Sequence, residues 1–119
     1  MSDNDPYPGN VTIAPEVLVT IVQQTALKDE NVQALAAKPP RRSRIKGPRA
    51  TAGGVEVVQG KEGLYAVIHI IAQPGANIMR LAESLQHDIA QALEQMVELP
   101  VARVGVFVDD VSAAGAGGG

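Results

Sequence analysis

The stretch that decides the fold covers residues 53–111 and reads GGVEVVQGKEGLYAVIHIIAQPGANIMRLAESLQHDIAQALEQMVELPVARVGVFVDDV. Two apolar runs, residues 55–58 and 64–71, flank a turn at residues 59–63 and predict a β-hairpin. A long amphipathic stretch and an alternating apolar run follow the hairpin. This order predicts two paired strands, a helix and a last strand.

The second run of the hairpin is apolar on both faces. Successive side chains of a strand point to opposite faces of the sheet. One face would carry Leu64, Ala66, Ile68 and Ile70, and the other Tyr65, Val67, His69 and Ile71. Helices on one side of such a sheet would leave the other side partly apolar, so we expect a partner chain or a covering segment there.

The amphipathic stretch predicts a helix from Ile78 to about Glu98. Asn77 is a good N-cap residue, and Pro100 ends the periodicity. A helix of this length spans about 30 Å at 1.5 Å per residue, enough to cross a small sheet. Apolar side chains recur at three-to-four spacing, which predicts a buried stripe of Ile78, Leu81, Ala82, Leu85, Ile89, Leu93 and Met96.

The last run predicts a strand over residues 101–108. It alternates Val104, Val106 and Val108 with Arg103, Gly105 and Phe107, and we expect Asp109 and Asp110 to end it in solvent.

The N-terminal part predicts a short strand at residues 11–13, a helix that begins at Pro15, and a second short strand at residues 32–36. Pro at the first helical position and Glu16 in the first turn favour the helix start. The expected buried stripe of this helix is Val17, Leu18, Ile21, Val22 and Leu27.

Together these elements predict an α+β fold: a small two-layer sandwich in which two helices pack on one face of a mixed β-sheet. A chain of 119 residues forms one ordinary domain, which we place at residues 10–111 between flexible tails at residues 1–9 and 112–119. The core must be aliphatic, because the chain has one Phe, two Tyr and no Trp.

The net charge of −3 conceals a strong asymmetry. Residues 38–49 carry six basic side chains and no acidic one, whereas the rest carries four basic and thirteen acidic side chains. The basic residues are Lys38, Arg41, Arg42, Arg44, Lys46 and Arg49. Pro39, Pro40, Gly47 and Pro48 break periodicity here, so we expect residues 38–53 to form an extended, mobile loop.

This loop could bind anions such as nucleic acid or acidic lipid. Beside an acidic leaflet each Lys or Arg contributes about 1 kcal/mol, and on nucleic acid six phosphate contacts would give a log–log salt slope of about −5. The body's charge opposes such binding, and no aromatic residue lies beside the loop to stack on bases. The alternative is a solvated loop that keeps the protein soluble.

Composition limits the other chemistry. The chain has no Cys, so disulfides and thiolate–metal sites are excluded, and no metal site or cofactor is predicted. The start lacks the pattern of a secretory signal, and no apolar run reaches the roughly 18 residues of a membrane span, so we expect a cytoplasmic protein.

Three further motifs have plainer interpretations than the chemical ones. Gly60-Lys-Glu-Gly63 matches the phosphate-clamping G-x-x-G of K-homology modules, but its flanks predict strands, so we interpret it as a hairpin turn. His69 and His87 would need nearby carboxylates for acid–base or metal chemistry, and nothing in the sequence brings them together. A small hydrolase has the least support, because none of the serines lies in a recognisable nucleophile setting.

Three segments in order carry a family resemblance: Gly9-Asn-Val-Thr-Ile-Ala-Pro-Glu-Val, Pro74-Gly-Ala-Asn-Ile before the long helix, and Val104-Gly-Val-Phe-Val-Asp-Asp-Val. Together they resemble the bacterial alkaline shock protein family, also called the envelope stress response family, over about residues 9–111. The basic, proline-rich loop departs from the family pattern.

The resemblance implies a small, non-enzymatic bacterial protein of the cytoplasm, peripheral at the inner face of the membrane and acting in cell-envelope homeostasis. It implies a scaffold that self-associates into a homo-oligomer and docks to a membrane-anchored protein, with no catalytic residue and no small-molecule substrate. From the strand pattern we expect the second sheet face to make these protein–protein contacts through Tyr65, Val67, His69, Ile71 and Phe107.

Overall fold

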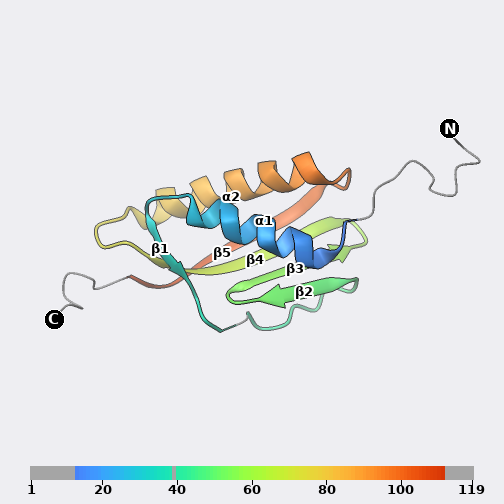
Figure 1. The fold of residues 1–119 in the computed structure, drawn as a ribbon, viewed down its shortest axis with the longest axis horizontal. Helices are drawn as coiled ribbons and strands as arrows, with labels where there is room; N and C mark the ends of the chain where they lie inside the picture. Colours follow the sequence, from blue (N-terminus) through green and yellow to red (C-terminus); the bar gives the residue numbers. More distant parts are fainter. Residues whose placement is uncertain (1–12, 39, 112–119) are drawn as a thin grey trace, which may run out of the picture.

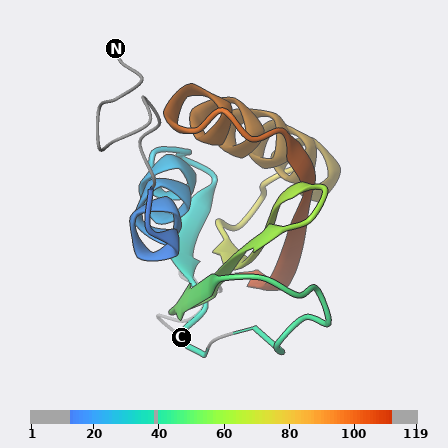
Figure 2. The same cartoon turned by 90° about the vertical axis from the view of Figure 1, so that its right-hand side faces the viewer.

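The computed structural model describes residues 13–38 and 40–111 and has two layers, a five-stranded sheet and two helices (Figure 1). The helices are α1 (Pro15–Leu27) and α2 (Ile78–Met96). The strands are β1 (Val32–Leu35), β2 (Arg49–Ala52), β3 (Val55–Gly60), β4 (Gly63–Ala72) and β5 (Val101–Val111). Figure 2 shows both helices on the same side of the sheet. The predicted α+β sandwich with a mixed sheet is therefore confirmed.

Strand β4 is the centre of the sheet. Its first part pairs with β3, its last three residues pair with β1, and both partners are antiparallel to it. Strand β5 runs parallel to β4 along nearly its whole length. Because β1 and β3 share one edge of β4, β5 occupies the other edge, and β2 pairs with β3. The sequence left this strand order open.

The predicted hairpin is confirmed, and Gly60 and Gly63 close its two-residue turn. Gly63 has a φ of +134°, and a Cβ at this position would lie 2.4 Å from the carbonyl oxygen of Pro100. Only glycine combines this backbone conformation with such a close approach. The G-x-x-G motif is therefore a turn of the sheet.

The core lies between the helices and one face of the sheet and is aliphatic, as predicted. Strand β4 contributes Leu64, Ala66, Ile68, Ile70 and Ala72 to it. Helix α2 contributes Leu81, Leu85, Ile89 and Leu93, and burying a side chain of this size stabilises a fold by about 1.5–3 kcal/mol. The spacing therefore identified the buried face of α2, whose N-cap is Asn77 as expected.

Four local expectations were wrong at their margins. In α1, Val17 and Leu27 are exposed, whereas Val19 and Ala26 are buried, because the helix is turned slightly from the expected orientation. Met96 at the end of α2 is exposed, because the next residue, Val97, packs against the core in its place. Strand β5 continues through Asp109 and Asp110 to Val111, because β4 is long enough to pair with it there. Residues 49–52 of the expected loop form β2, because β3 offers them a free edge.

Other expectations fall on the chain ends. Residues 11 and 12 of the expected first strand lie outside the described part of the chain, as do the tails at 1–9 and 112–119. Ile13 itself is not in a strand and packs against the core.

Candidate functional site

The face of the sheet opposite the helices is divided into two halves. Residues 40–48 cross the outer side of β3, away from both helices (Figure 2). We call this stretch the covering segment and the surface over β3 the covered half. The surface over β4 and β5 is the open half. It carries Tyr65, Val67, His69, Ile71 and Phe107. The covering segment anticipated from the sequence is thus present on one half only.

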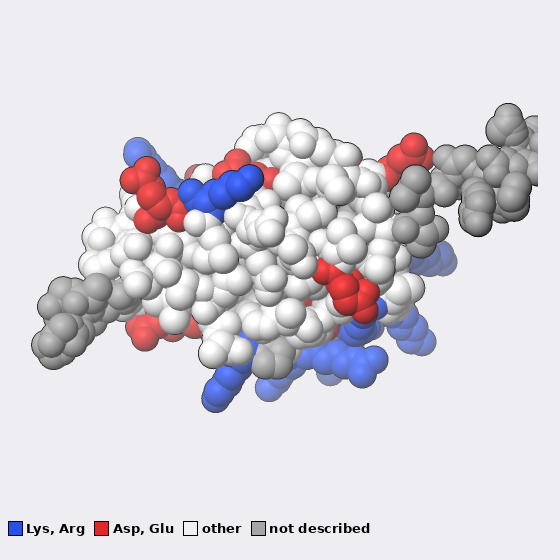
Figure 3. All heavy atoms as spheres, in the orientation of Figure 1, with Lys and Arg blue, Asp and Glu red and all other residues white. Residues whose placement is uncertain are grey.

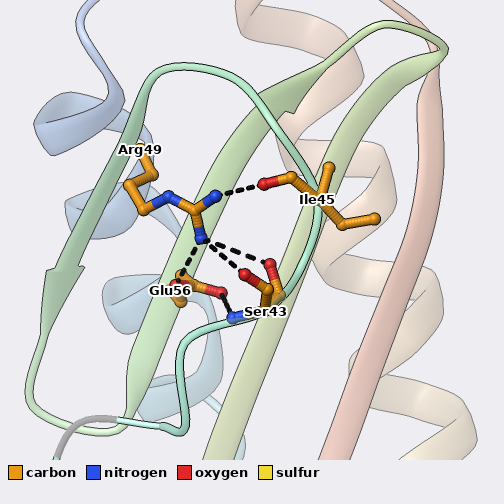
Figure 4. A network of polar contacts seen from close by, with 4 residues as sticks. All are labelled: Ser43, Ile45, Arg49 and Glu56. Atoms are coloured by element: carbon orange, nitrogen blue, oxygen red, sulfur yellow. Dashed lines mark hydrogen bonds and ion pairs between the residues drawn. The ribbon is translucent and has the colours of Figure 1, made fainter.

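A buried ion pair holds the covering segment in place (Figure 4). Glu56 of β3 is 2% exposed, and Arg49 Nη1 donates to its Oε2 at 3.1 Å. The same guanidinium nitrogen also donates to the carbonyl and hydroxyl of Ser43, at 3.2 and 3.3 Å. The other nitrogen, Nη2, donates to the carbonyl of Ile45, and the Ser43 backbone N–H donates to Glu56 Oε1 at 3.3 Å. Both carboxylate oxygens and the guanidinium are therefore satisfied, as a buried charge pair requires.

The network separates Arg49 from the other basic residues of its segment. Lys38, Arg41, Arg42, Arg44 and Lys46 are all exposed, whereas Arg49 is largely buried, with 18% of its side chain exposed. Figure 3 shows Lys and Arg gathered along the lower edge of the molecule, where β2 and the covering segment lie. Four of the five exposed basic residues belong to the covering segment, and Lys38 precedes it in the sequence.

The boundary between the two halves lies at Tyr65. A Cβ built on Gly60 would be 2.8 Å from the ring of Tyr65 and 2.9 Å from Ile45 Cγ2. Ile45 of the covering segment and Tyr65 of β4 therefore both lie over this glycine. Tyr65 is therefore the first residue of the open half.

On the open half, β4 and β5 bring His69, Phe107 and Asp109 together. The rings of His69 and Phe107 are stacked, with centroids 4.7 Å apart and an interplanar angle of 9°. His69 Nδ1 lies 2.8 Å from Asp109 Oδ1. Phe107 is 52% exposed, while Tyr65, Val67, His69 and Ile71 are each partly exposed. All five residues expected at an interaction face therefore lie on one surface.

The His69–Asp109 contact corrects the expectation that nothing brings a histidine to a carboxylate. The parallel pairing places His69 beside Phe107, so Asp109, two residues further along β5, reaches the same face. His87 is exposed on α2, as its position on the polar side of the helix predicted. In residues 13–38 and 40–111, no three potential ligands among His, Asp and Glu converge on a point that could hold a metal ion.

Sequence reasoning missed the Arg49–Glu56 network. The available signal was Glu56 itself, a charged residue within the apolar run 55–58. A carboxylate on a buried strand needs a partner, but the run alone does not say which of six nearby cations supplies it. Only the path of the covering segment selects Arg49.

A model of the alkaline shock protein family, described as having a cell envelope-related function, matches residues 3–113. The comparisons with curated proteins and with solved structures gave no match. Neither described helix combines the length and the apolar character needed to cross a membrane. The family match covers nearly the whole chain and agrees with the resemblance found in the sequence. This chain therefore belongs to the alkaline shock protein family, whose function is related to the cell envelope.

Proposed function

We propose that this protein is a non-enzymatic scaffold of cell-envelope homeostasis that acts by self-association and by docking to a membrane-anchored protein. The observation that carries the proposal is the open half of the sheet. It presents a contiguous, partly exposed apolar surface on rigid, paired strands. Exposed apolar patches on a regular element are typical of protein–protein contact surfaces.

The covered half strengthens this interpretation by contrast. The same sheet face is closed over β3, where Glu56 and Val58 are almost fully buried. Over β4 and β5 the chain leaves similar apolar side chains uncovered, among them Phe107. Aromatic side chains, Phe included, are enriched in protein interfaces relative to the rest of the surface.

The family supplies the biological setting. A cell envelope-related function needs a route to the membrane, and neither described helix could span one. A membrane-anchored protein that docks on the open half would provide this route and place the chain peripherally at the inner face of the membrane.

The test is association measured by light scattering over a range of protein concentrations. The variant Phe107→Ser should weaken association, because it removes the most exposed aromatic side chain of the open half. Met79→Ser is the matched control, since Met79 is 71% exposed but lies on α2. A strictly monomeric wild type at high concentration would count against the proposal, as would equal effects of the two variants.

Docking needs a separate experiment in the native cell. A tagged wild-type chain should co-purify with a membrane-anchored protein, and the Phe107→Ser variant should recover less of it. Equal recovery of that protein by both chains would remove the open half as the docking surface.

A second candidate function, anion binding, is favoured by the anchoring of the covering segment. Because Arg49 ties the segment to β3, the exposed basic residues are held near one another on one surface. Such a cluster attracts phosphate groups, on a membrane or on a nucleic acid, and its action would depend on salt.

The test replaces the exposed basic residues Lys38, Arg41, Arg42, Arg44 and Lys46 with Ser or Gln and leaves Arg49 in place. Binding is measured to anionic vesicles, to neutral vesicles and to single-stranded nucleic acid at several salt concentrations. With five phosphate contacts, the log–log salt slope for the wild type on a single strand would be about −3.5. Unchanged binding by the variant would exclude these five basic residues as the binding site.

A further inference from the structure

Strand β5 is the longest strand of the sheet and forms one of its edges. It pairs with β4 on one side, and no described residue forms a ladder with it on the other. Exposed edges are usually blunted by short length, charged side chains, proline or β-bulges, because unpaired backbone groups attract another strand. In β5 the charged residues and the two irregularities lie towards its ends, and residues 104–108 are uncharged and regularly paired. β5 has 11 residues and contains neither lysine nor proline. β2, at the opposite edge, has four residues and follows directly after Pro48.

Helix α2 shows which backbone groups of β5 face outward. In a parallel ladder, alternate residues direct their N–H and C=O groups to the neighbouring strand, and the residues between them direct theirs away. Gln86 Nε2 of α2 donates to the carbonyl of Val104 at 3.3 Å, which indicates that this carbonyl lies on the outer edge. Val106 is two residues further along β5, so its backbone N–H and C=O groups also point outward.

We propose that the outer edge of β5 pairs antiparallel with β5 of a second copy of this chain, about a two-fold axis at Val106. Val106 is the midpoint of β5, and the central pairs of this register fall in residues 103–108, where β5 runs in regular register with β4 between two irregularities. The central hydrogen-bonded pairs would be Val106 with Val106 and Val104 with Val108 of the second copy, and the Val108 N–H of that copy would replace Gln86 Nε2 as the donor to the Val104 carbonyl. The proposal rests on the self-association proposed above and assigns it to an edge and a register.

Charge complementarity supports this register. Arg103 would lie opposite Asp109 of the second copy, and the two-fold axis would repeat the pair. Both side chains are exposed, and Arg103 makes no ion pair with any other described residue. Asp109 contacts His69 through Oδ1, so Oδ2 would accept from Arg103 of the second copy. Opposite charges directly across an antiparallel pair are stabilising, and like charges are destabilising. A shift by one residue along either strand would lose both pairs.

Side-chain size supports the same register. Phe107 would lie opposite Gly105 of the second copy, at a pair that is not hydrogen-bonded and where side chains are closest. Gly105 has no side chain to compete with the aromatic ring. The pairing would also place the open halves of the two copies side by side and form one continuous apolar surface. Such an isologous contact closes a dimer.

Disulfide cross-linking tests the edge and the register together. The chain contains no Cys, so each single-Cys variant reports one position without background. Val106→Cys places two thiols across the axis at a Cα separation of about 5.5 Å, which a disulfide spans. Arg103→Cys is the matched control, because the two copies of residue 103 would lie six residues apart. Mild oxidation should cross-link the first variant and leave the second monomeric on a denaturing gel.

Charge reversal gives a second test with exposed residues that do not carry the fold. Arg103→Glu and Asp109→Lys should each weaken self-association about tenfold, because both attractive pairs become repulsive. Mixing the two variants restores both pairs, so sedimentation should show a heterodimer about as strong as the wild-type dimer.

The outcomes separate this proposal from the proposed function. Light-scattering dimers without a Val106→Cys cross-link, or with equal cross-linking of Arg103→Cys, would overturn the edge pairing and leave self-association through the open half. Association unchanged by either charge reversal would overturn the register. A wild type that remains monomeric at all concentrations would overturn both proposals.

Discussion

The covered and open halves belong to the same face of the sheet, but the chain covers the first half and leaves the second exposed. Over β3, the chain adds its own covering segment and seals the face with the Arg49–Glu56 pair. Over β4 and β5, the face carries a stacked His69–Phe107 pair and remains partly exposed. The covering segment reaches across the sheet only as far as Tyr65. Apolar surface therefore stays exposed over β4 and β5, which are the longest strands.

The difference shows how a buried charge can determine the path of a chain. Glu56 cannot be buried alone, and the covering segment brings the cation and the N–H donor that it requires. The open half has no buried charge and therefore imposes no such requirement on the chain. We expect substitutions in the covered half to change stability and substitutions in the open half to change association.

The largest effect should follow from Glu56→Ala. The substitution leaves Arg49 and the Ser43 N–H without their carboxylate partner, and removing one member of a buried pair costs about 3–5 kcal/mol. Because Arg49 retains some exposure, we expect a loss near the lower end, about 3 kcal/mol in the free energy of unfolding. Chemical denaturation measures this loss.

Two further variants sharpen the interpretation of Glu56. Glu62→Ala, in the exposed hairpin turn, is the control and should change stability by less than about 0.5 kcal/mol. The apolar double replacement Arg49→Met with Glu56→Leu should recover part of the lost stability, because it leaves no unpaired charge. A cost below about 1 kcal/mol for Glu56→Ala would show that the pair does not hold the covered half together.

The next effect concerns Gly47, where the backbone of the covering segment lies close to that of β3. Its φ is +143°, and a Cβ would lie 2.0 Å from the carbonyl oxygen of Gln59. We expect Gly47→Ala to cost about 2–3 kcal/mol and to speed hydrogen exchange in residues 40–48. Gly75→Ala is the control, since its φ is +81° but no atom lies within 4 Å, so only about 1 kcal/mol of strain is expected. Equal costs would mean that the close approach is not important.

A smaller effect on stability should follow from Phe107→Ser. The side chain is half-exposed, so the loss of its contact with His69 should cost no more than about 1 kcal/mol in the free energy of unfolding. Association should nevertheless weaken, as described for the scattering experiment. A loss of stability as large as that of Glu56→Ala would show that the open half supports the fold as much as the covered half does.

The smallest effect should follow from Asp109→Asn. Asp109 is 44% exposed, and an exposed polar pair of this kind is worth about 0–1 kcal/mol. We expect a change within about 0.5 kcal/mol in thermal or chemical unfolding, because the amide can still bond to His69. A loss above about 1.5 kcal/mol would show that the His69–Asp109 contact supports the fold rather than lying on its surface.

The elements of the sheet and of α2 were predictable because their signals are local. The alternation of Leu64, Ala66, Ile68 and Ile70 identified the buried face of β4, and the spacing of Leu81 and Leu85 identified that of α2. The apolar second face was equally visible in Tyr65, Val67 and Ile71. Strand β2 was missed because residues 49–52 have no strong strand pattern and become a strand only by pairing with β3.

Of the candidate site, the sequence alone determined the basic residues and the apolar second face, while the tertiary structure added Glu56 and Asp109 and decided the arrangement. Composition and periodicity revealed a basic segment, an aliphatic core and an apolar second face, because these depend on neighbouring residues. The internal role of Arg49, the meeting of His69 with Asp109 and the division of the face into two halves depend on contacts between distant segments. The parallel pairing of β5 with β4 and the path of residues 40–48 create those contacts, and no local pattern encodes either of them.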